Sequence, residues 1–460
     1  MINIKQSNHI LLTGAICTLI GMIWYLAPNP IVGMVLAFVP LGILFVLSQT
    51  FWLVTLFVVF SFFRIHEVFP AIYNFKIPLL LSMGALSALL WHSLISRNLK
   101  LYWHPTFLWL VIFWLLVFFG LFAASNVGIA VSTFTATYWK IIVMTLAIAW
   151  LVKTEKDLAR FSMLIILSGI IVGTVALYNS VNGIGLVEGS RVTIGREFGS
   201  MLGDPNDLSL VLMFPLAFAI SLATTRKIPI IPKLLSIITI VILMLAILAT
   251  QSRGGLLGSL SVFSVFAWRM IKSKTLFFTL GAIAAIVLYA VAGISDRSSG
   301  GAAEEGVDES AMGRIYAWEA AIRMAVENPL TGVGLENFFY NYFYYSSHWD
   351  GLNHAVHSTW FGVLAETGFL GLIVFVTSIV SLFKTARRTL DSLGALPTPP
   401  PYIMASALAA FSGLVGTCVS GTFLTQGFNW PINILAAVTI AVSQIANQIE
   451  KPKNLKGKEN

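Results

Sequence analysis

Residues 230–255 read IIPKLLSIITIVILMLAILATQSRGG, and this stretch decides the fold class. Its first twenty residues include only one charged side chain, Lys233. A membrane-spanning helix needs about 20 mainly apolar residues, because the hydrocarbon offers no partner for an open backbone. A second apolar run follows over 255–271, directly after the polar turn that contains Arg253. The stretch therefore predicts two spans joined by a short turn.

The rest of the chain has the same character. Of its 460 residues, 57% are hydrophobic and 10% are charged, whereas a soluble domain carries about 25% charged residues. This composition excludes an ordinary water-soluble enzyme and a disordered chain. The two cysteines, Cys17 and Cys418, lie in apolar runs and supply neither a disulfide framework nor a cysteine-rich metal site. We expect an all-α, polytopic integral membrane bundle.

Apolar runs separated by polar breaks predict about twelve to fourteen spans. The pair at 31–63 is either two tilted spans or a re-entrant pair, and the first run is expected to be a retained span, not a signal peptide. The candidate spans lie near 10–27, 31–48, 51–63, 77–96, 105–124, 128–152, 157–179, 206–224, 230–249, 255–271, 275–294, 357–383, 402–422 and 430–448.

Basic residues set the orientation, since lysine and arginine in short loops stay on the cytoplasmic side. With the N-terminus inside, 19 of the 28 basic residues fall in inner segments, and the alternation holds along the whole chain. The net charge of +8 is therefore a topology signal, and we predict no nucleic-acid partner. The expected segments are an N-terminal transmembrane bundle (1–180), a transmembrane segment with external arginine loops (181–294), an external loop (295–356), C-terminal transmembrane helices (357–448) and a disordered cytoplasmic tail (449–460).

The external basic residues are almost all arginines, whereas lysine dominates inside. A guanidinium offers a planar fork of donors that matches phosphate oxygens and keeps its charge near apolar surroundings. Alternatively, single arginines cap helix ends or pair with loop carboxylates. The external basic residues are Arg64, Lys76, Arg191, Arg196, Arg253, Arg297, Arg314 and Arg323.

The external loop 295–356 holds nine acidic residues, three arginines and no lysine. Its first part, 298–310, is small and acidic and is expected to be a flexible surface stretch. An amphipathic helix should begin at Gly313 and lie along the membrane surface. Its apolar stripe is Ile315, Trp318, Ala321, Ile322 and Ala325. Arg314 would then lie in the first turn, where the helix dipole disfavours a cation. This placement suggests an anionic partner, unless Asp308 or Glu309 neutralises it.

The loop ends in aromatic residues and two histidines. The run 338–349 fits an interfacial aromatic belt, and it also fits a platform for sugar rings. His357, at the start of the next span, is a candidate general base, because histidine accepts a proton near neutral pH. A metal site with His354, or a hydrogen-bonded interfacial histidine, are the alternatives. Glu366 lies inside the span, where an ionisable group is a functional or packing site.

Two further external elements could meet this region. Asp204 followed by Pro205 is a strong helix-start signal, and that helix would direct its backbone amides to the outer surface. Arg191 and Arg196 lie in the loop that leads to it. Arg253 lies in the tight turn after the run quoted above, at the depth of a lipid phosphate.

Together these motifs resemble the O-antigen ligase and polymerase superfamily of bacterial inner-membrane glycosyltransferases, over about residues 200 to 370. The motifs that carry the resemblance are Asp204-Pro205-Asn206, Ser252-Arg253-Gly254, Gly313-Arg314 with Ala317-Trp318, Asn328-Pro329-Leu330, Gly332-Val333-Gly334, His357 and Ala365-Glu366-Thr367-Gly368.

The resemblance implies a helical fold of the lipid-sugar glycosyltransferase kind in the bacterial inner membrane, with the external loop and the active site in the periplasm. In the ligase branch, polysaccharide moves from undecaprenyl diphosphate to a sugar of the lipid A core, without a metal or another cofactor. The essential histidine and two arginines of that branch carry over to His357, Arg253 and Arg314. We expect Arg191, Arg196, Asp204, Asn206, His354 and Glu366 to contribute to substrate binding.

The hypothesis is that the arginines hold the diphosphate while His357 deprotonates the acceptor hydroxyl, with inversion at the anomeric carbon. An O-antigen polymerase, whose acceptor is a second lipid-linked oligosaccharide, and a protein O-oligosaccharyltransferase remain alternatives, because their donor side is alike. A membrane transporter belongs to a different class and would show inverted repeats and broken helices. A structural scaffold would leave the external arginines unexplained.

Overall fold

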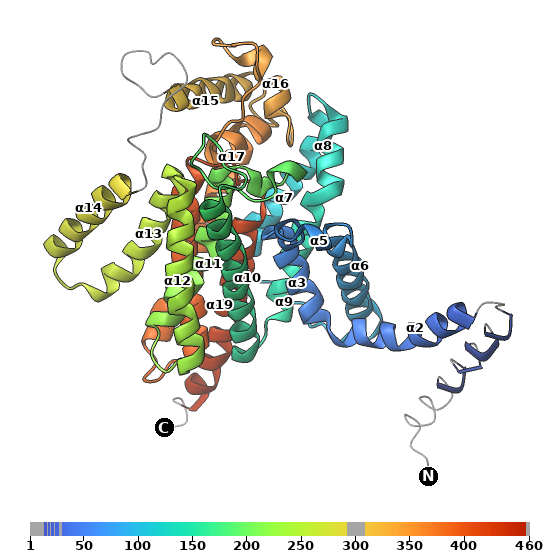
Figure 1. Ribbon diagram of the computed structural model, residues 1–460. Helices are drawn as coiled ribbons and strands as arrows, with labels where there is room; N and C mark the ends of the chain where they lie inside the picture. Colours follow the sequence, from blue (N-terminus) through green and yellow to red (C-terminus); the bar gives the residue numbers. More distant parts are fainter. Residues whose placement is uncertain are drawn as a thin grey trace. The chain divides into compact units, whose positions relative to one another are not determined.

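The computed structural model describes residues 30–291 and 309–456, together with 13–15, 17–18, 20–22 and 24–26 (Figure 1). These residues form helices joined by turns, and no strand occurs among them. The predicted all-α, polytopic fold is therefore confirmed. The acidic stretch expected to be flexible, 298–310, lies largely outside the described residues.

The chain divides into two compact units. The smaller unit comprises the residues up to Phe57 and Pro78–Lys100, and the larger one comprises Val58–Ile77 and everything from Leu101 onward. The helices of the smaller unit are α2 (Pro30–Ser48), most of α3 (Thr50–Phe62), α6 (Ile77–Leu90) and η1 (Trp91–Ile95). All the candidate site residues belong to the larger unit.

The larger unit contains the remaining helices of the described chain. In order they are α4 (Ile65–Val68), α5 (Pro70–Tyr73), α7 (Phe107–Gly120), η2 (Leu121–Ala123), α8 (Val127–Thr133), η3 (Phe134–Tyr138), α9 (Trp139–Leu151), α10 (Glu155–Asn182), η4 (Arg196–Phe198), η5 (Met201–Gly203), α11 (Pro205–Thr224), α12 (Ile230–Thr250), α13 (Arg253–Met270), α14 (Lys274–Val291), α15 (Glu309–Glu327), α16 (Phe338–Tyr345), α17 (Thr359–Gly394), α18 (Pro401–Gly421) and α19 (Trp430–Lys456). The last helix therefore runs past 448 into the segment expected to be a tail.

Eight helices in the described residues are long and apolar enough to cross a membrane, which is fewer than the twelve to fourteen spans counted from the sequence. The run at 31–63 forms a helix pair bent by 79°, and the runs near 10–27, 105–124 and 275–294 give shorter apolar helices. The run at 255–271 lies in α13, which is less apolar because Arg253 and Arg269 lie near its two ends. The expected runs within the described residues are helical, and eight of the helices are each long and apolar enough to span alone.

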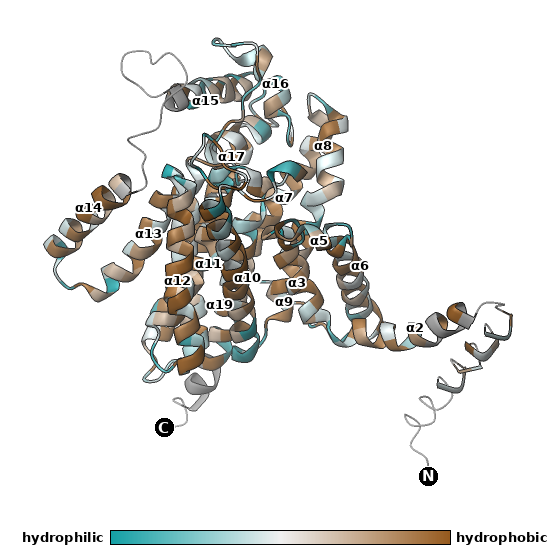
Figure 2. Ribbon diagram, in the orientation of Figure 1, coloured by the Kyte–Doolittle hydropathy of each residue, from teal (hydrophilic) through white to brown (hydrophobic). Residues whose placement is uncertain are grey.

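Burial separates the central helices from the peripheral ones. Within their most apolar windows, 83% of α11 is buried inside the protein, but only 28% of α12. α11 packs against α10, α12, α13 and α18, so it forms the centre of the bundle. α12 turns a hydrophobic surface outward, which Figure 2 shows along its length. Such a surface is stable only against lipid or another apolar partner.

The external loop folds into a small layer of its own at one end of α10, α11 and α12 (Figure 1). Its core contains Ala317, Ala321 and Met324 of α15 together with Phe338 and Tyr342 of α16, all at most 3% exposed. Aromatic rings thus fill part of the core, so not all of them form a surface belt.

Two details of the predicted amphipathic helix were wrong. α15 begins at Glu309, so Arg314 lies in its second turn and the dipole argument no longer applies to it. Ala321 and Ala325 of the predicted stripe are buried and Trp318 packs against the core, as predicted, whereas Ile315 and Ile322 are 48% and 44% exposed. The small side chains allow α15 to lie close to the outer end of α17.

α17 is interrupted at Gly368, whose φ of 69° and ψ of −173° are not helical. The break frees backbone carbonyls, and the segment after α15 uses them. The Val333 amide donates to the Ala365 carbonyl at 2.8 Å, and the Phe369 amide donates to the Pro329 carbonyl at 2.8 Å. The glycine and proline motifs of both segments therefore serve one interface, in which each buried backbone group finds a partner.

We expect Gly368→Ala to destabilise the protein by about 2–4 kcal/mol. A Cβ at this position would lie 2.5 Å from the Pro329 carbonyl oxygen, and the backbone conformation is one that side chains other than glycine avoid. The thermal unfolding midpoint in nanodiscs measures the effect. Gly394→Ala is the matched control, because a Cβ there meets nothing within 4 Å. Equal midpoints for the two variants would show that the break imposes no requirement for glycine.

Candidate functional site

Two helices start side by side at the outer end of the bundle. Asp204 caps α11, as predicted, by accepting the amides of Asn206 at 2.7 Å and Asp207 at 3.2 Å. Ser252 caps α13 and accepts the amide of Gly255 at 3.3 Å. The N-terminal ends of both helices therefore carry a partial positive charge on the same side of the bundle.

Asn206 joins these two helix starts. Its side-chain carbonyl accepts hydrogen bonds from Ser252 Oγ and from Arg191 Nη2, both at 3.0 Å. Arg191 is 5% exposed and also donates to the Thr250 carbonyl at 3.1 Å. Arg191 and Asn206 thus fix the turn that presents Arg253. Arg196, by contrast, is exposed on η4.

Several of the external arginines pair with carboxylates, which was the alternative interpretation of their role. Arg64 pairs with Glu67 at 2.9 Å, and Arg323 pairs with Glu319 at 2.6 Å. Arg191 has Glu188 at 3.5 Å in addition to the contacts above. These pairs neutralise charge close to the backbone and need no substrate to explain them.

Phe423 contacts both Arg314 and the first turn of α13, which begins at Arg253. The guanidinium carbon of Arg314 lies 6.0 Å from the ring centre of Phe423, in the loop after α18. Gly254, the neighbour of Arg253, packs against the same phenylalanine, with 3.2 Å between the Cβ position of the glycine and Cβ of Phe423. The loop after α18 therefore lies against Arg314 and against the helix start that carries Arg253, although the two arginines are 61 positions apart in the sequence.

His357 lies two residues before Thr359, which begins α17 and donates from Oγ1 to the Leu424 carbonyl of this loop at 2.7 Å. The φ of His357 is 44°, a left-handed conformation that is uncommon for residues other than glycine and that costs about 1–3 kcal/mol. Burial lowers the pKa of His357 below its ordinary value, and the Arg314 cation lowers it further. Asp204 raises this pKa and His354 lowers it, so all three side chains act on His357 electrostatically. The imidazole is therefore kept neutral near pH 7.

Two of the predicted site residues point elsewhere. His354 Nε2 lies 2.9 Å from Asp350 Oδ2, and its ring meets Tyr342 edge-on at 5.4 Å. Glu366, which is 7% exposed, accepts the backbone amide of Glu336 at 2.9 Å. Both residues therefore bind other groups of the loop 295–356. In the described part of the chain, no group of three histidine, cysteine or acidic side chains could hold a metal ion.

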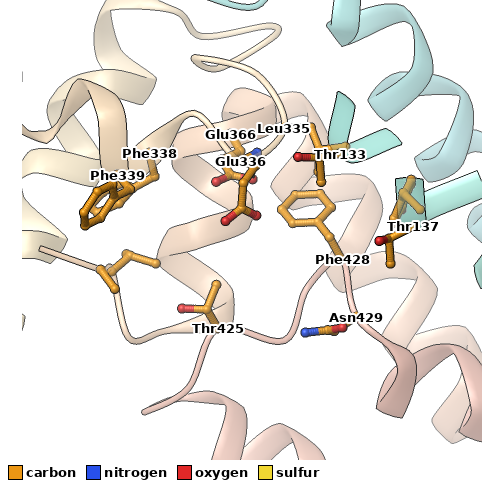
Figure 3. A pocket seen from close by; sticks show the side chains of 13 residues that line it. Thr133, Thr137, Leu335, Glu336, Phe338, Phe339, Glu366, Thr425, Phe428 and Asn429 are labelled. Atoms are coloured by element: carbon orange, nitrogen blue, oxygen red, sulfur yellow. Dashed lines mark hydrogen bonds between the residues drawn. The ribbon is translucent and has the colours of Figure 1, made fainter. Parts of the chain in front are cut away.

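Glu366 lines a cavity of about 300 Å³, shown from close by in Figure 3. The Glu336 and Glu366 side chains lie next to one another, with Phe428 beside them (Figure 3). Sequence reasoning missed this cavity. Its residues are the following: Thr133, Thr137, Tyr138, Leu335, Glu336, Phe338, Phe339, Ala355, Val356, Glu366, Thr425, Phe428 and Asn429. They come from four distant segments, and only the ionisable Glu366 gave a signal in the sequence.

The comparison with protein families agrees with the motifs. Residues 238–376 match the family model described as O-antigen ligase. This region includes Arg253, Arg314 and His357, whereas Asp204 lies upstream of it. The match confirms the resemblance to the O-antigen ligase superfamily, and it supports a glycosyl transfer of the ligase or polymerase type in a multi-pass membrane protein. Among curated proteins, none matches the chain.

Proposed function

We propose that this protein is an O-antigen ligase of the bacterial inner membrane, which transfers polysaccharide from undecaprenyl diphosphate to a lipid A-core sugar on the periplasmic side. The observation that carries the proposal is that Arg314 and Asp204 both act electrostatically on His357, while the start of α13, which carries Arg253, packs against the Phe423 that Arg314 contacts. The family match supports the class of reaction. The positions of these residues support their assignment to the reacting site.

Arg253 and Arg314 suit the diphosphate of the donor. Two guanidinium groups can each offer parallel N–H donors to phosphate oxygens, and the N-terminal ends of α11 and α13 add backbone dipoles of the same sign. When the bond between the anomeric carbon and the diphosphate breaks, its electron pair stays on the leaving oxygen. Fixed cations around that oxygen stabilise the charge more in the transition state than in the bound donor.

His357 suits the acceptor. A neutral imidazole can take the proton of the acceptor hydroxyl as that oxygen attacks the anomeric carbon. Attack from the face opposite the diphosphate gives inversion without a covalent intermediate on the enzyme. The proton ends on His357 and the two electrons of the old bond end on the lipid diphosphate, so the step is balanced without a redox partner or cofactor.

The acceptor identity is the critical test. The purified protein in proteoliposomes receives undecaprenyl-diphosphate glycan, a chelator, and one of three acceptors: lipid A-core, a second lipid-linked oligosaccharide, or a serine- and threonine-containing peptide. We expect transfer to lipid A-core alone. Transfer only to the lipid-linked oligosaccharide would make the protein a polymerase, and transfer only to peptide would make it a protein oligosaccharyltransferase. Loss of transfer in the chelator would contradict the metal-independent scheme.

The pH dependence of kcat/KM should report on His357. Because burial and Arg314 lower the pKa of this base, the wild-type rate should fall only below about pH 6.5, the ordinary value for histidine. Arg314→Gln removes a cation, raises this pKa and moves the acidic limb to higher pH. Asp204→Asn removes an anion while keeping a helix cap, and moves the limb to lower pH. Shifts in the same direction for both variants would exclude His357 as the titrating group.

A further inference from the structure

The cavity that contains Glu336 and Glu366 is unexplained by the arginine and histidine group. Ala355 and Val356 line it, and they immediately precede His357 in the chain. Since neighbouring Cα atoms are about 3.8 Å apart, the backbone of His357 directly continues this wall of the cavity. Its volume of about 300 Å³ is at the lower end of the range for small-molecule sites.

One wall of the cavity is formed by an irregular turn. The span Val127–Leu151 changes to a π-helix over η3, Phe134–Tyr138, and Thr137 and Tyr138 of this turn line the cavity. Single π-turns inside α-helices occur often at functional sites. Tyr138 is 1% exposed, yet its hydroxyl finds no hydrogen-bond partner within the described residues. A buried hydroxyl without a partner is costly, and a ligand in the cavity could supply one.

The opposite wall carries the two carboxylates. The amide of Glu336 holds Glu366 at 2.9 Å, and Glu336 itself has a φ of 57°, which strains its backbone. Strain of this kind persists only where the surrounding structure enforces it, and it is concentrated at binding sites. Both side chains offer oxygen acceptors to the cavity, beside the hydroxyl of Thr425 and the amide of Asn429 (Figure 3).

An aromatic ring completes the set. Phe428 lines the cavity, stacks on Phe113 of α7 at 5.9 Å and meets Tyr138 edge-on at 5.9 Å. Its position is therefore fixed by packing. A fixed aromatic ring beside paired acceptors and hydroxyls matches a sugar ring, which has an apolar C–H face and an edge of hydroxyl donors. Burial raises the pKa of Glu336, and two acidic groups held this close do not both carry a negative charge, so the pair can donate as well as accept hydrogen bonds, as a neutral sugar requires.

We propose that this cavity binds a sugar ring of the acceptor and presents its hydroxyl to His357. The inference rests on the proposed function for the direction of transfer, and on the cavity itself for the saccharide. Phe428 covers the C–H face of the ring, and Glu336 and Glu366 accept hydrogen bonds from its hydroxyls. The donor diphosphate stays with Arg253 and Arg314.

The test distinguishes an effect on acceptor binding from an effect on donor binding. Steady-state transfer is measured with rough-form lipopolysaccharide as acceptor and undecaprenyl-diphosphate glycan as donor, varying each in turn. Phe428→Ala should raise the KM for the acceptor about tenfold and leave the KM for the donor unchanged, and Phe428→Tyr should restore the wild-type value. Phe278→Ala, at an exposed aromatic residue of α14 outside the cavity, is the control. A rise in the donor KM instead, or no rise in either, overturns the proposal.

Thr137→Val serves if Phe428→Ala does not fold, because it removes one cavity hydroxyl at nearly constant volume. It should raise the acceptor KM about fivefold. Calorimetry measures the binding of delipidated core oligosaccharide to the purified protein without donor. This measurement tests the cavity assignment independently of the proposed function. If the wild type binds this oligosaccharide, loses affinity through Phe428→Ala and yet transfers nothing, the proposed function fails and the cavity assignment stands. If the wild type transfers glycan but neither variant weakens oligosaccharide binding, the cavity assignment fails alone.

Discussion

Replacing His357 with alanine should lower kcat for glycan transfer by about 10²–10⁴-fold, the usual contribution of a general base. Neutral imidazole is the group available to take the acceptor proton, and burial together with Arg314 keeps it neutral. Transfer from undecaprenyl-diphosphate glycan to lipid A-core in proteoliposomes measures the loss. Histidine and alanine bear a similar backbone strain at the positive φ of 44°. The variant should therefore unfold at nearly the wild-type temperature.

His348→Ala is the matched control for this experiment. His348 belongs to the same external loop, but it stacks on Tyr316 at 3.9 Å and its side chain is 49% exposed. Its loss should leave transfer close to the wild-type rate. Wild-type transfer by the His357 variant would remove the base from the mechanism, whereas loss of transfer in both variants would indicate a general disturbance of the loop.

Arg253→Lys should lower kcat by about 10²–10³-fold, the effect of removing one preorganised donor from a developing negative charge. Lysine keeps the charge but cannot offer two parallel donors to a phosphate. The same transfer assay measures the rate. Arg323→Lys is the control, since Arg323 pairs with Glu319 on the exposed side of α15.

The outcome discriminates between two roles of Arg253. A large drop with an unchanged unfolding temperature supports contact with the diphosphate. If Arg253→Lys transfers glycan as fast as the wild type, a point charge is sufficient and the paired-donor geometry is wrong. A drop that accompanies a lower unfolding temperature would instead assign Arg253 to the packing of α13 against the loop that contains Phe423.

Local sequence signals predicted local structure well. The run quoted first forms α12, and Asp204 with Pro205 starts α11 where the sequence places it. Hydropathy and capping act within a few residues, so they can be read along the chain. The same signals misplaced the start of α15, because a helix with a small, alanine-rich buried face shows a weak apolar stripe. Helix propensity and the apolar stripe alone do not locate the first residue of such a helix.

The sequence by itself determined an all-helical membrane protein and the motifs of the O-antigen ligase superfamily, because these depend on composition and short spacing. Only the tertiary structure decided which polar groups meet. It placed Arg314 and Gly254 in contact with Phe423 and interrupted α17 at Gly368. It also brought Tyr138, Glu336 and Phe428 together around one cavity. The reason is that these groups lie far apart in the chain and converge only when the helices that carry them pack together.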